Sequence, residues 1–124
     1  MLKVEHIGIA VKNLAIAIPI YEKLLNTSCY KMEQIISENV NTAFFKKGET
    51  KIELLESTAA ESAIAKFIDK RGEGLHHIAF EVEDIVAEMQ RLREEGFTLI
   101  NEQPKRGADN KLVCFLHPKM LVGY

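Results

Sequence analysis

Apolar and polar residues alternate in two widely separated segments, 4–11 and 75–82, and this period of two predicts β-strands. Each segment runs into an Asx residue, Asn13 or Asp84, and then into a stretch with helical spacing of its apolar side chains. Because Asn and Asp side chains accept hydrogen bonds from the first free N–H groups of a helix, both residues are predicted N-caps. Pro19 lies inside the first helical stretch and is expected to kink the helix there.

The two segments belong to one internal repeat. A shift of 71 residues lays HIGIAVKNLAIAI (6–18) over HIAFEVEDIVAEM (77–89), and His6 then falls on His77. Further short strands are predicted after each helical stretch, at 28–36, 41–47 and 50–56 in the first copy and at 97–102 and 111–117 in the second. The chain therefore repeats one β-α-β-β-β pattern.

This repeat predicts a single domain, 1–124, of the α+β class. We expect a first module at 1–57, a helical connector at 58–73 and a second module at 74–124. Two modules related by a pseudo-two-fold axis would pair into a curved sheet around a shared concavity. The second copy has no counterpart of the strand at 50–56, which predicts that a last strand is missing from this sequence.

Composition narrows the range of partners. Of the 124 residues, 47% are hydrophobic and 27% charged, which is ordinary for a globular domain, and the net charge is −2. These values give no reason to expect a nucleic-acid or membrane partner, and no apolar run approaches the roughly 20 residues of a membrane span. Neither Cys29 nor Cys114 lies in a CxxC motif, so we expect reduced thiols in a cytoplasmic protein.

The repeated histidines fall on comparable faces of their strands. Alternation groups His6 with Gly8 and Ala10, and His77 with Ala79. Small residues beside a polar one leave room for a bound group. The neighbouring His76 falls on the other face of its strand, among apolar residues, and is expected to be structural.

A third strand contributes Glu53, which alternation separates from Ile52 and Leu54. If the modules pair as proposed, His6, Glu53 and His77 converge in the concavity. Two imidazoles and one carboxylate suit a divalent ion and leave coordination positions open for a substrate. The alternative is that the histidines are satisfied structural residues and Glu53 is a solvated edge residue. The repetition of the histidine favours the metal site.

Four segments of the chain carry a family resemblance: VEHIGIAV, IELLE, SAIAKFIDKRGEGLHHIAFEVEDI and FLHPK. Over nearly the whole chain the sequence resembles the methylmalonyl-CoA epimerases of the vicinal oxygen chelate (glyoxalase-like) superfamily. The resemblance implies paired modules, a homodimer, and a divalent metal such as cobalt, manganese or zinc. The metal ligands that it implies are His6, Glu53 and His77, with His76 as a structural neighbour.

The implied activity is the interconversion of (R)- and (S)-methylmalonyl-CoA, an isomerase reaction. It proceeds by removal of the C2 proton through an enolate that a metal stabilises. Glu53 is the candidate acid/base within this chain. Lys119, in FLHPK, would approach the phosphates or carboxylate of an acyl-CoA, or it is a solvated hairpin lysine.

The sequence departs from the family in two places. The family continues past FLHPK into a last strand whose glutamate is expected to be the fourth metal ligand and the main base, so we expect the natural protein to extend beyond Tyr124. The second departure is Thr42, where some relatives carry a further carboxylate; Glu38 lies close by, and the second base stays open.

Two other function classes stay open. One is another glyoxalase-like metalloenzyme, either a glyoxalase-type isomerase or an Fe(II) dioxygenase, because two histidines and one carboxylate also bind non-haem iron. The other is a metal-free protein of the same fold that binds small molecules. The presence of His6, Glu53 and His77 weighs against the second class.

Overall fold

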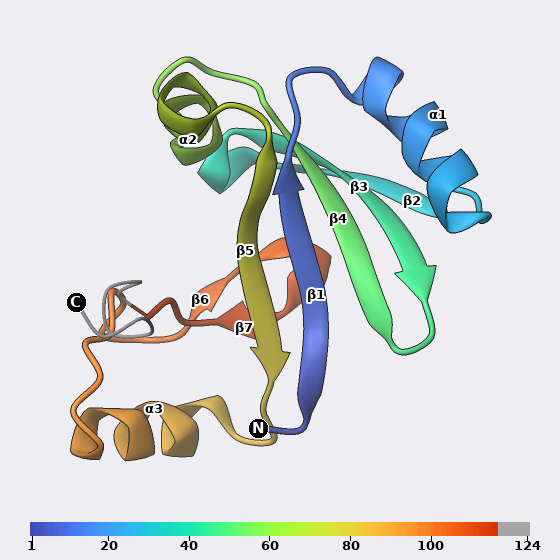
Figure 1. Ribbon diagram of the computed structural model, residues 1–124. Helices are drawn as coiled ribbons and strands as arrows, with labels where there is room; N and C mark the ends of the chain where they lie inside the picture. Colours follow the sequence, from blue (N-terminus) through green and yellow to red (C-terminus); the bar gives the residue numbers. More distant parts are fainter. Residues whose placement is uncertain (117–124) are drawn as a thin grey trace. The chain divides into compact units, whose positions relative to one another are not determined.

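A computed structural model describes residues 1–116 of the chain (Figure 1). By its internal contacts the chain forms two compact units. One comprises residues 3–81, and the other comprises Met1–Leu2 together with the residues from Val82 onward. The division falls after Glu81, whereas the sequence repeat divides the chain at residues 58 and 74, so the module boundaries stay a prediction.

The unit of residues 3–81 contains five strands and two α-helices. The strands are β1 (Lys3–Ala10), β2 (Lys31–Ile35), β3 (Val40–Lys47), β4 (Thr50–Ser57) and β5 (Gly74–Glu81), and the helices are α1 (Leu14–Leu25) and α2 (Ala63–Arg71), with a short 3-10 turn at Ile36–Glu38. The strands form one sheet in the order β2-β3-β4-β1-β5. Only β1 and β4 run parallel; the other neighbours are antiparallel. The predicted α+β class is confirmed.

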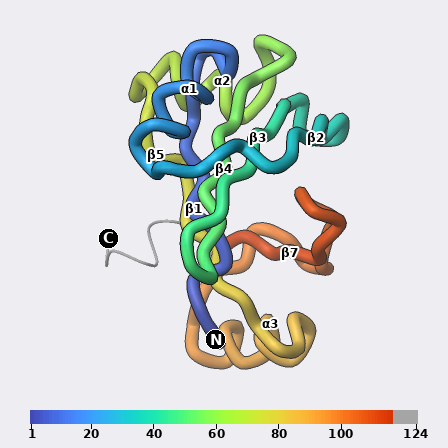
Figure 2. Tube along the Cα trace, turned by 90° about the vertical axis from the view of Figure 1, so that its right-hand side faces the viewer, coloured from blue at the N-terminus to red at the C-terminus, as the bar shows by residue number. Residues whose placement is uncertain are grey.

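The first strands of the two sequence copies are neighbours in this sheet. β1 opens the first copy and β5 opens the second, and the two pair antiparallel, side by side in Figure 1. This pairing places the repeated histidines on adjacent strands. Both α1 and α2 lie near the end of the sheet where β1 ends, as the turned view of Figure 2 also shows.

The helices begin where the sequence predicts. The side chain of Asn13 accepts a hydrogen bond from the backbone N–H of Ala15 at 2.8 Å, which confirms it as the N-cap of α1. Asp84 accepts from the backbone N–H of Ala87 at 3.1 Å and caps α3 (Ile85–Glu94). Pro19 lies inside α1, as expected.

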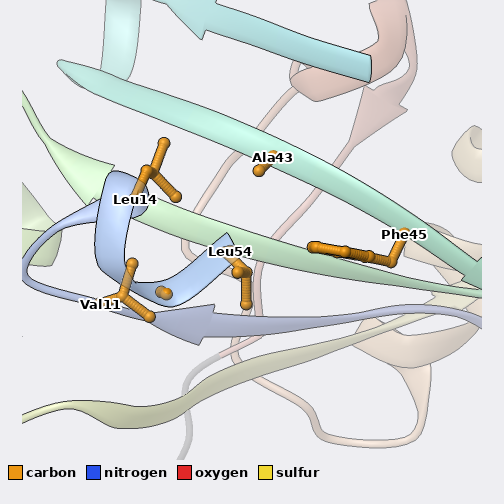
Figure 3. Close-up of a cluster of buried hydrophobic side chains, with 6 residues drawn as sticks. Val11, Leu14, Ala43, Phe45 and Leu54 are labelled. Atoms are coloured by element: carbon orange, nitrogen blue, oxygen red, sulfur yellow. The ribbon is translucent and has the colours of Figure 1, made fainter. Parts of the chain in front are cut away.

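Apolar residues pack on both faces of the sheet. On the face covered by α1, Val11 and Leu14 pack against Ala43, Phe45 and Leu54 of β3 and β4 (Figure 3). On the opposite face a second cluster joins the sheet to α2: Ala10, Val40, Leu55 and Ile64. Since residues alternate along a strand, Glu53 shares this second face with Leu55.

The other unit contains α3 (Ile85–Glu94), β6 (Lys105–Arg106) and β7 (Leu112–Val113), with a 3-10 turn at Ala108–Asn110 between the two short strands. Short strands were expected at 97–102 and 111–117. Within the described residues, the second segment contains β7, whereas the first contributes an isolated bridge from Leu99 to Leu116. Pairing between β6 and β7 spans two residues. The turn, where Asp109 and Asn110 adopt positive φ, limits this ladder.

Helix length and polarity bear on membrane insertion. Among the residues that the structure describes, none of the helices combines the length and the apolar composition required to span a bilayer.

Candidate metal centre

The pairing of β1 with β5 brings the two repeated histidines into contact. His6 pairs with Ala79, and Gly8 pairs with His77, so the imidazoles reach toward each other across the two strands. Their rings meet edge to face, with centroids 5.0 Å apart and planes at 87°. The Nε2 atoms lie 2.9 Å from each other. The predicted proximity of His6 and His77 is thus present in the structure.

Gly8 is the residue that makes room for the His77 ring. A Cβ atom built on Gly8 would lie 2.2 Å from Cε1 of His77 and 2.6 Å from its Nδ1. The sequence suggested that small neighbours leave space for a bound group. The structure shows that the space at Gly8 is filled by the imidazole itself.

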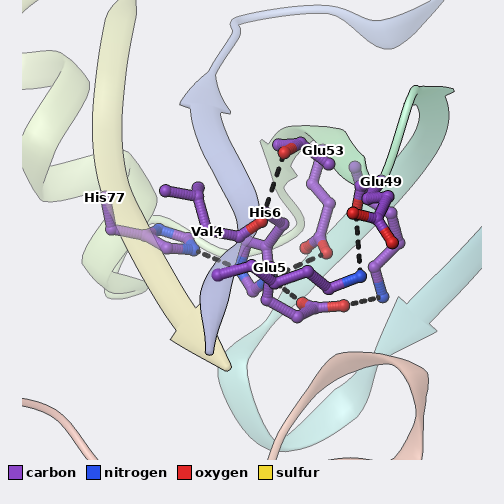
Figure 4. Close-up of polar contacts among 9 residues, drawn as sticks. Val4, Glu5, His6, Glu49, Glu53 and His77 are labelled. Atoms are coloured by element: carbon purple, nitrogen blue, oxygen red, sulfur yellow. Dashed lines mark hydrogen bonds and ion pairs between the residues drawn. The ribbon is translucent and has the colours of Figure 1, made fainter. Parts of the chain in front are cut away.

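Glu53 lies on the other side of His6. It is 2% exposed, and its Oε2 lies 3.3 Å from Nδ1 of His6 (Figure 4). His77 meets His6 at Nε2, so Glu53 and His77 approach different nitrogens of the same ring. The structure therefore brings His6 next to both of its expected partners, while the three-residue ligand set stays a prediction.

Glu5 is a site residue that the sequence reasoning missed. Its Oε1 lies 2.5 Å from Nδ1 of His6, and its Oε2 lies 2.6 Å from Nζ of Lys51. Among the described residues, one group of side chains offers three ligand atoms within 4.8 Å of one another: Glu5, His6 and Glu53. Strict alternation along a strand would place Glu5 on the face opposite His6.

Burial sets the protonation states around this cluster. Burial, with smaller contributions from His6 and His76, lowers the pKa of His77 to about 4. Burial also lowers the pKa of His76. For Glu5, burial raises the pKa, but hydrogen bonds from His6 and Lys51 and their positive charge outweigh it, so the net shift is downward. At neutral pH His77 is therefore a neutral imidazole with a lone pair, the form that binds metal.

The remaining predicted residues lie around or outside this cluster. Nδ1 of His76 lies 2.9 Å from Nδ1 of His77, and the His76 ring meets Phe67 edge to face at 4.9 Å. Thr42 is fully buried, and its hydroxyl has no hydrogen-bond partner in the part of the chain that the structure describes. Glu38 ends the 3-10 turn that follows β2. Lys119 lies outside the described residues.

The fold and this cluster define a class of protein. The family model of the Glyoxalase/Bleomycin resistance protein/Dioxygenase superfamily matches residues 5–115, and the chain belongs to that superfamily.

Individual relatives within that superfamily are epimerases. The chain is 39% identical to the ethylmalonyl-CoA/methylmalonyl-CoA epimerase of Cereibacter sphaeroides, with 94% of this chain and 89% of the relative covered. Among solved structures, a variant of the Streptomyces coelicolor methylmalonyl-CoA epimerase, in complex with 2-nitronate-propionyl-CoA, is 32% identical. It superposes with a TM-score of 0.93 over 99% of this chain and 92% of its own.

A third similarity is to a hypothetical protein from Bacillus halodurans C-125. It is 46% identical, with a TM-score of 0.94 over 98% of this chain and 88% of its own. These similarities extend over both compact units of the chain.

Proposed function

We propose that this protein is a metal-dependent epimerase that interconverts (R)- and (S)-methylmalonyl-CoA. The identity to the Cereibacter epimerase over nearly the full chain supports the substrate class. The single structural observation that carries the proposal is the contact between His6 and His77, whose Nε2 atoms lie 2.9 Å apart on adjacent strands.

The donor set fits a divalent ion such as cobalt, manganese or zinc. Imidazole nitrogens bind zinc at about 2.0–2.1 Å, so two of them on adjacent coordination positions are about 3 Å apart. The separation of the His6 and His77 Nε2 atoms matches that value. Glu53 is the proposed third ligand; its buried carboxylate lies at the Nδ1 edge of His6, so it must reorient to share an ion with the two Nε2 atoms.

The chemistry follows from the substrate. The C2 proton of methylmalonyl-CoA lies between a thioester and a carboxylate, so its removal yields an enolate. A bound divalent ion supplies Lewis-acid stabilisation of the negative charge that develops on the substrate oxygens. Glu53 is the proposed acid/base of this chain, and epimerisation requires a further group on the opposite face of C2.

Three further attributes belong to the same proposal. The protein acts as a homodimer in the cytoplasm, and it binds the acyl-CoA with help from Lys119.

Deuterium exchange tests the function directly. The protein is incubated with methylmalonyl-CoA in D₂O, and loss of the C2 proton signal is followed by NMR. We expect exchange that a chelator abolishes and Co²⁺ restores. His77→Ala should lose the exchange, whereas Glu61→Gln, at an exposed carboxylate before α2, should keep it. A protein that holds metal without exchange would indicate another glyoxalase-like chemistry, and one that holds no metal would indicate a binding protein.

A further inference from the structure

The strand β1 carries a β-bulge immediately before His6. In the pairing with β5, Val4 lies opposite Phe80 and His6 lies opposite Ala79, so Glu5 has no counterpart. An extra residue in one strand locally breaks the alternation of side chains and redirects them. This explains why Glu5 contacts the residue that follows it, His6, although strict alternation would send the two side chains to opposite faces.

The strand β5 carries a second irregularity, immediately before His77. Here Gly8 lies opposite His77 and Ile9 lies opposite Leu75, so His76 is the residue without a counterpart. The two irregularities occur at equivalent positions of the sequence repeat, because the shift that lays His6 on His77 also lays Glu5 on His76.

Each bulge residue contacts the same atom of the histidine that follows it. Oε1 of Glu5 lies 2.5 Å from Nδ1 of His6, and Nδ1 of His76 lies 2.9 Å from Nδ1 of His77. In both copies the Nδ1 atom is therefore engaged by the preceding residue, while the two Nε2 atoms face each other.

We propose that Glu5 and His76 are positioning residues that fix the tautomers of His6 and His77. A neutral imidazole carries one N–H and one lone pair. When Nδ1 donates to the bulge residue, the lone pair is left on Nε2, and an ion that displaces the proton shared by the two Nε2 atoms can bind both of them. This inference rests on the metal site proposed above and assigns the ligand atom within it. It gives His76, which the sequence indicated to be structural, a role toward the ligand.

Glu5 is better suited to this role than to metal ligation. Its second carboxylate oxygen pairs with Nζ of Lys51, whose side chain is 9% exposed. The same ammonium group lies 5.9 Å from the centre of the Phe44 ring. A buried cation beside the carboxylate opposes the approach of a divalent ion, whereas it strengthens the ability of Glu5 to hold one orientation.

For this tautomer of His77, the Nδ1 atom of His76 must accept the hydrogen bond that Nδ1–H of His77 donates. Its proton then lies on Nε2. The edge-to-face contact with Phe67 holds the His76 ring in place from the side of α2. The tautomers expected in the metal-bound protein are therefore Nδ1–H for His6 and His77 and Nε2–H for His76.

Long-range ¹H–¹⁵N correlation NMR on the Zn²⁺-loaded full chain tests these assignments without any substitution. We expect His6 and His77 to keep a proton on Nδ1 and to bind the ion through Nε2 at pH 7.5. A protonated Nε2 at either residue would overturn the proposal. A wild-type protein that takes up no Zn²⁺ would instead contradict the proposed function, so the two failures are distinguishable.

Paired variants test the consequence for metal binding. Glu5→Gln with Lys51→Met keeps the acceptor at position 5 for Nδ1 of His6, whereas Glu5→Leu with Lys51→Met removes it and leaves Glu53, whose Oε2 lies 3.3 Å from the same atom. Both double variants lack the charged pair. Loss of such an outer contact typically weakens metal affinity about 10- to 100-fold. We expect that loss in Co²⁺ titrations of the Leu variant relative to the Gln variant, together with a change of the His6 tautomer.

The equivalent pair at the second bulge is His76→Asn against His76→Leu, with Glu61→Gln as the surface control. The Asn side chain offers an amide oxygen to His77, and Leu offers none. Folding of each variant is checked by circular dichroism. If both Leu variants fold and match their partners in Co²⁺ affinity and in tautomer, the proposal is wrong. If a Leu variant does not fold, the NMR measurement of the His6 and His77 tautomers in the wild-type protein decides whether the proposal holds.

Discussion

The imidazole of His77 fills the space beside Gly8 on the neighbouring strand that any side chain larger than hydrogen would need. Gly8 does not adopt a backbone conformation reserved for glycine, so the requirement is one of space alone. The sheet therefore fixes the position of a proposed metal ligand through the absence of a side chain on the strand beside it.

Gly8→Ala should displace the His77 ring. A methyl group forced into such a close contact typically lowers the free energy of unfolding by about 1–3 kcal/mol, measured by urea denaturation. Co²⁺ affinity should fall at the same time, because His77 can no longer face His6. In the double variant Gly8→Ala with His77→Ala, stability should largely recover while the affinity does not. Additive losses of stability in the double variant would contradict the steric explanation.

The sequence predicted the contact of His6 with His77 but not the environment of either ring. The contact followed from the repeat, because equivalent strands of paired modules are natural neighbours. Glu5 could not be found by alternation, since its bulge depends on how β1 pairs with a strand more than 70 residues away. One signal was available: the repeat aligns Glu5 with His76, so a polar residue precedes both repeated histidines.

The strands of the second copy were predicted less well than those of the first. The segments of β3 and β4 were expected nearly to the residue, because each concentrates apolar residues and Gly48 marks the turn between them. Residues 97–116 also contain apolar segments, yet pairing is limited to short ladders around a turn with two residues at positive φ. Local pattern does not report where such a turn interrupts a ladder.

Thr42 offers a test of buried polarity. Its hydroxyl is fully buried without a hydrogen-bond partner among the described residues, and such a group costs about 1–3 kcal/mol. Thr42→Val should therefore raise the free energy of unfolding of the ligand-free protein by about 1 kcal/mol in urea denaturation. Thr50→Val is the matched control, because the Thr50 hydroxyl donates to the carbonyl of Val4 at 3.2 Å. The control should lose about 1 kcal/mol. A destabilised Thr42→Val would indicate that the hydroxyl is satisfied in solution.

Ser62 should be the most important helix cap of the unit of residues 3–81. It is 4% exposed, accepts from the backbone N–H of Ala65 at 3.0 Å, and contacts the hydroxyl of Ser57 at 2.6 Å. Ser62→Ala should lower the thermal midpoint in calorimetry and cost about 2 kcal/mol, the upper end for a cap. Asn13→Ala, at the exposed cap of α1, should cost about 0.5–1 kcal/mol. Equal losses in the two variants would show that the buried contact of Ser62 with Ser57 does not strengthen the cap.

Metal binding should raise the free energy of unfolding of the protein. An ion that binds the folded chain alone stabilises it by about 2.7 kcal/mol at a free concentration 100 times its Kd. We expect Co²⁺ to raise the free energy of unfolding, measured by urea denaturation, by about that amount. EDTA should reverse the change. His77→Ala should abolish the increment, since it removes one of the two facing Nε2 atoms, whereas Glu61→Gln should retain it. An increment that survives in His77→Ala would mean that the ion binds through Glu5, His6 and Glu53, the other group of ligand atoms that the structure brings together.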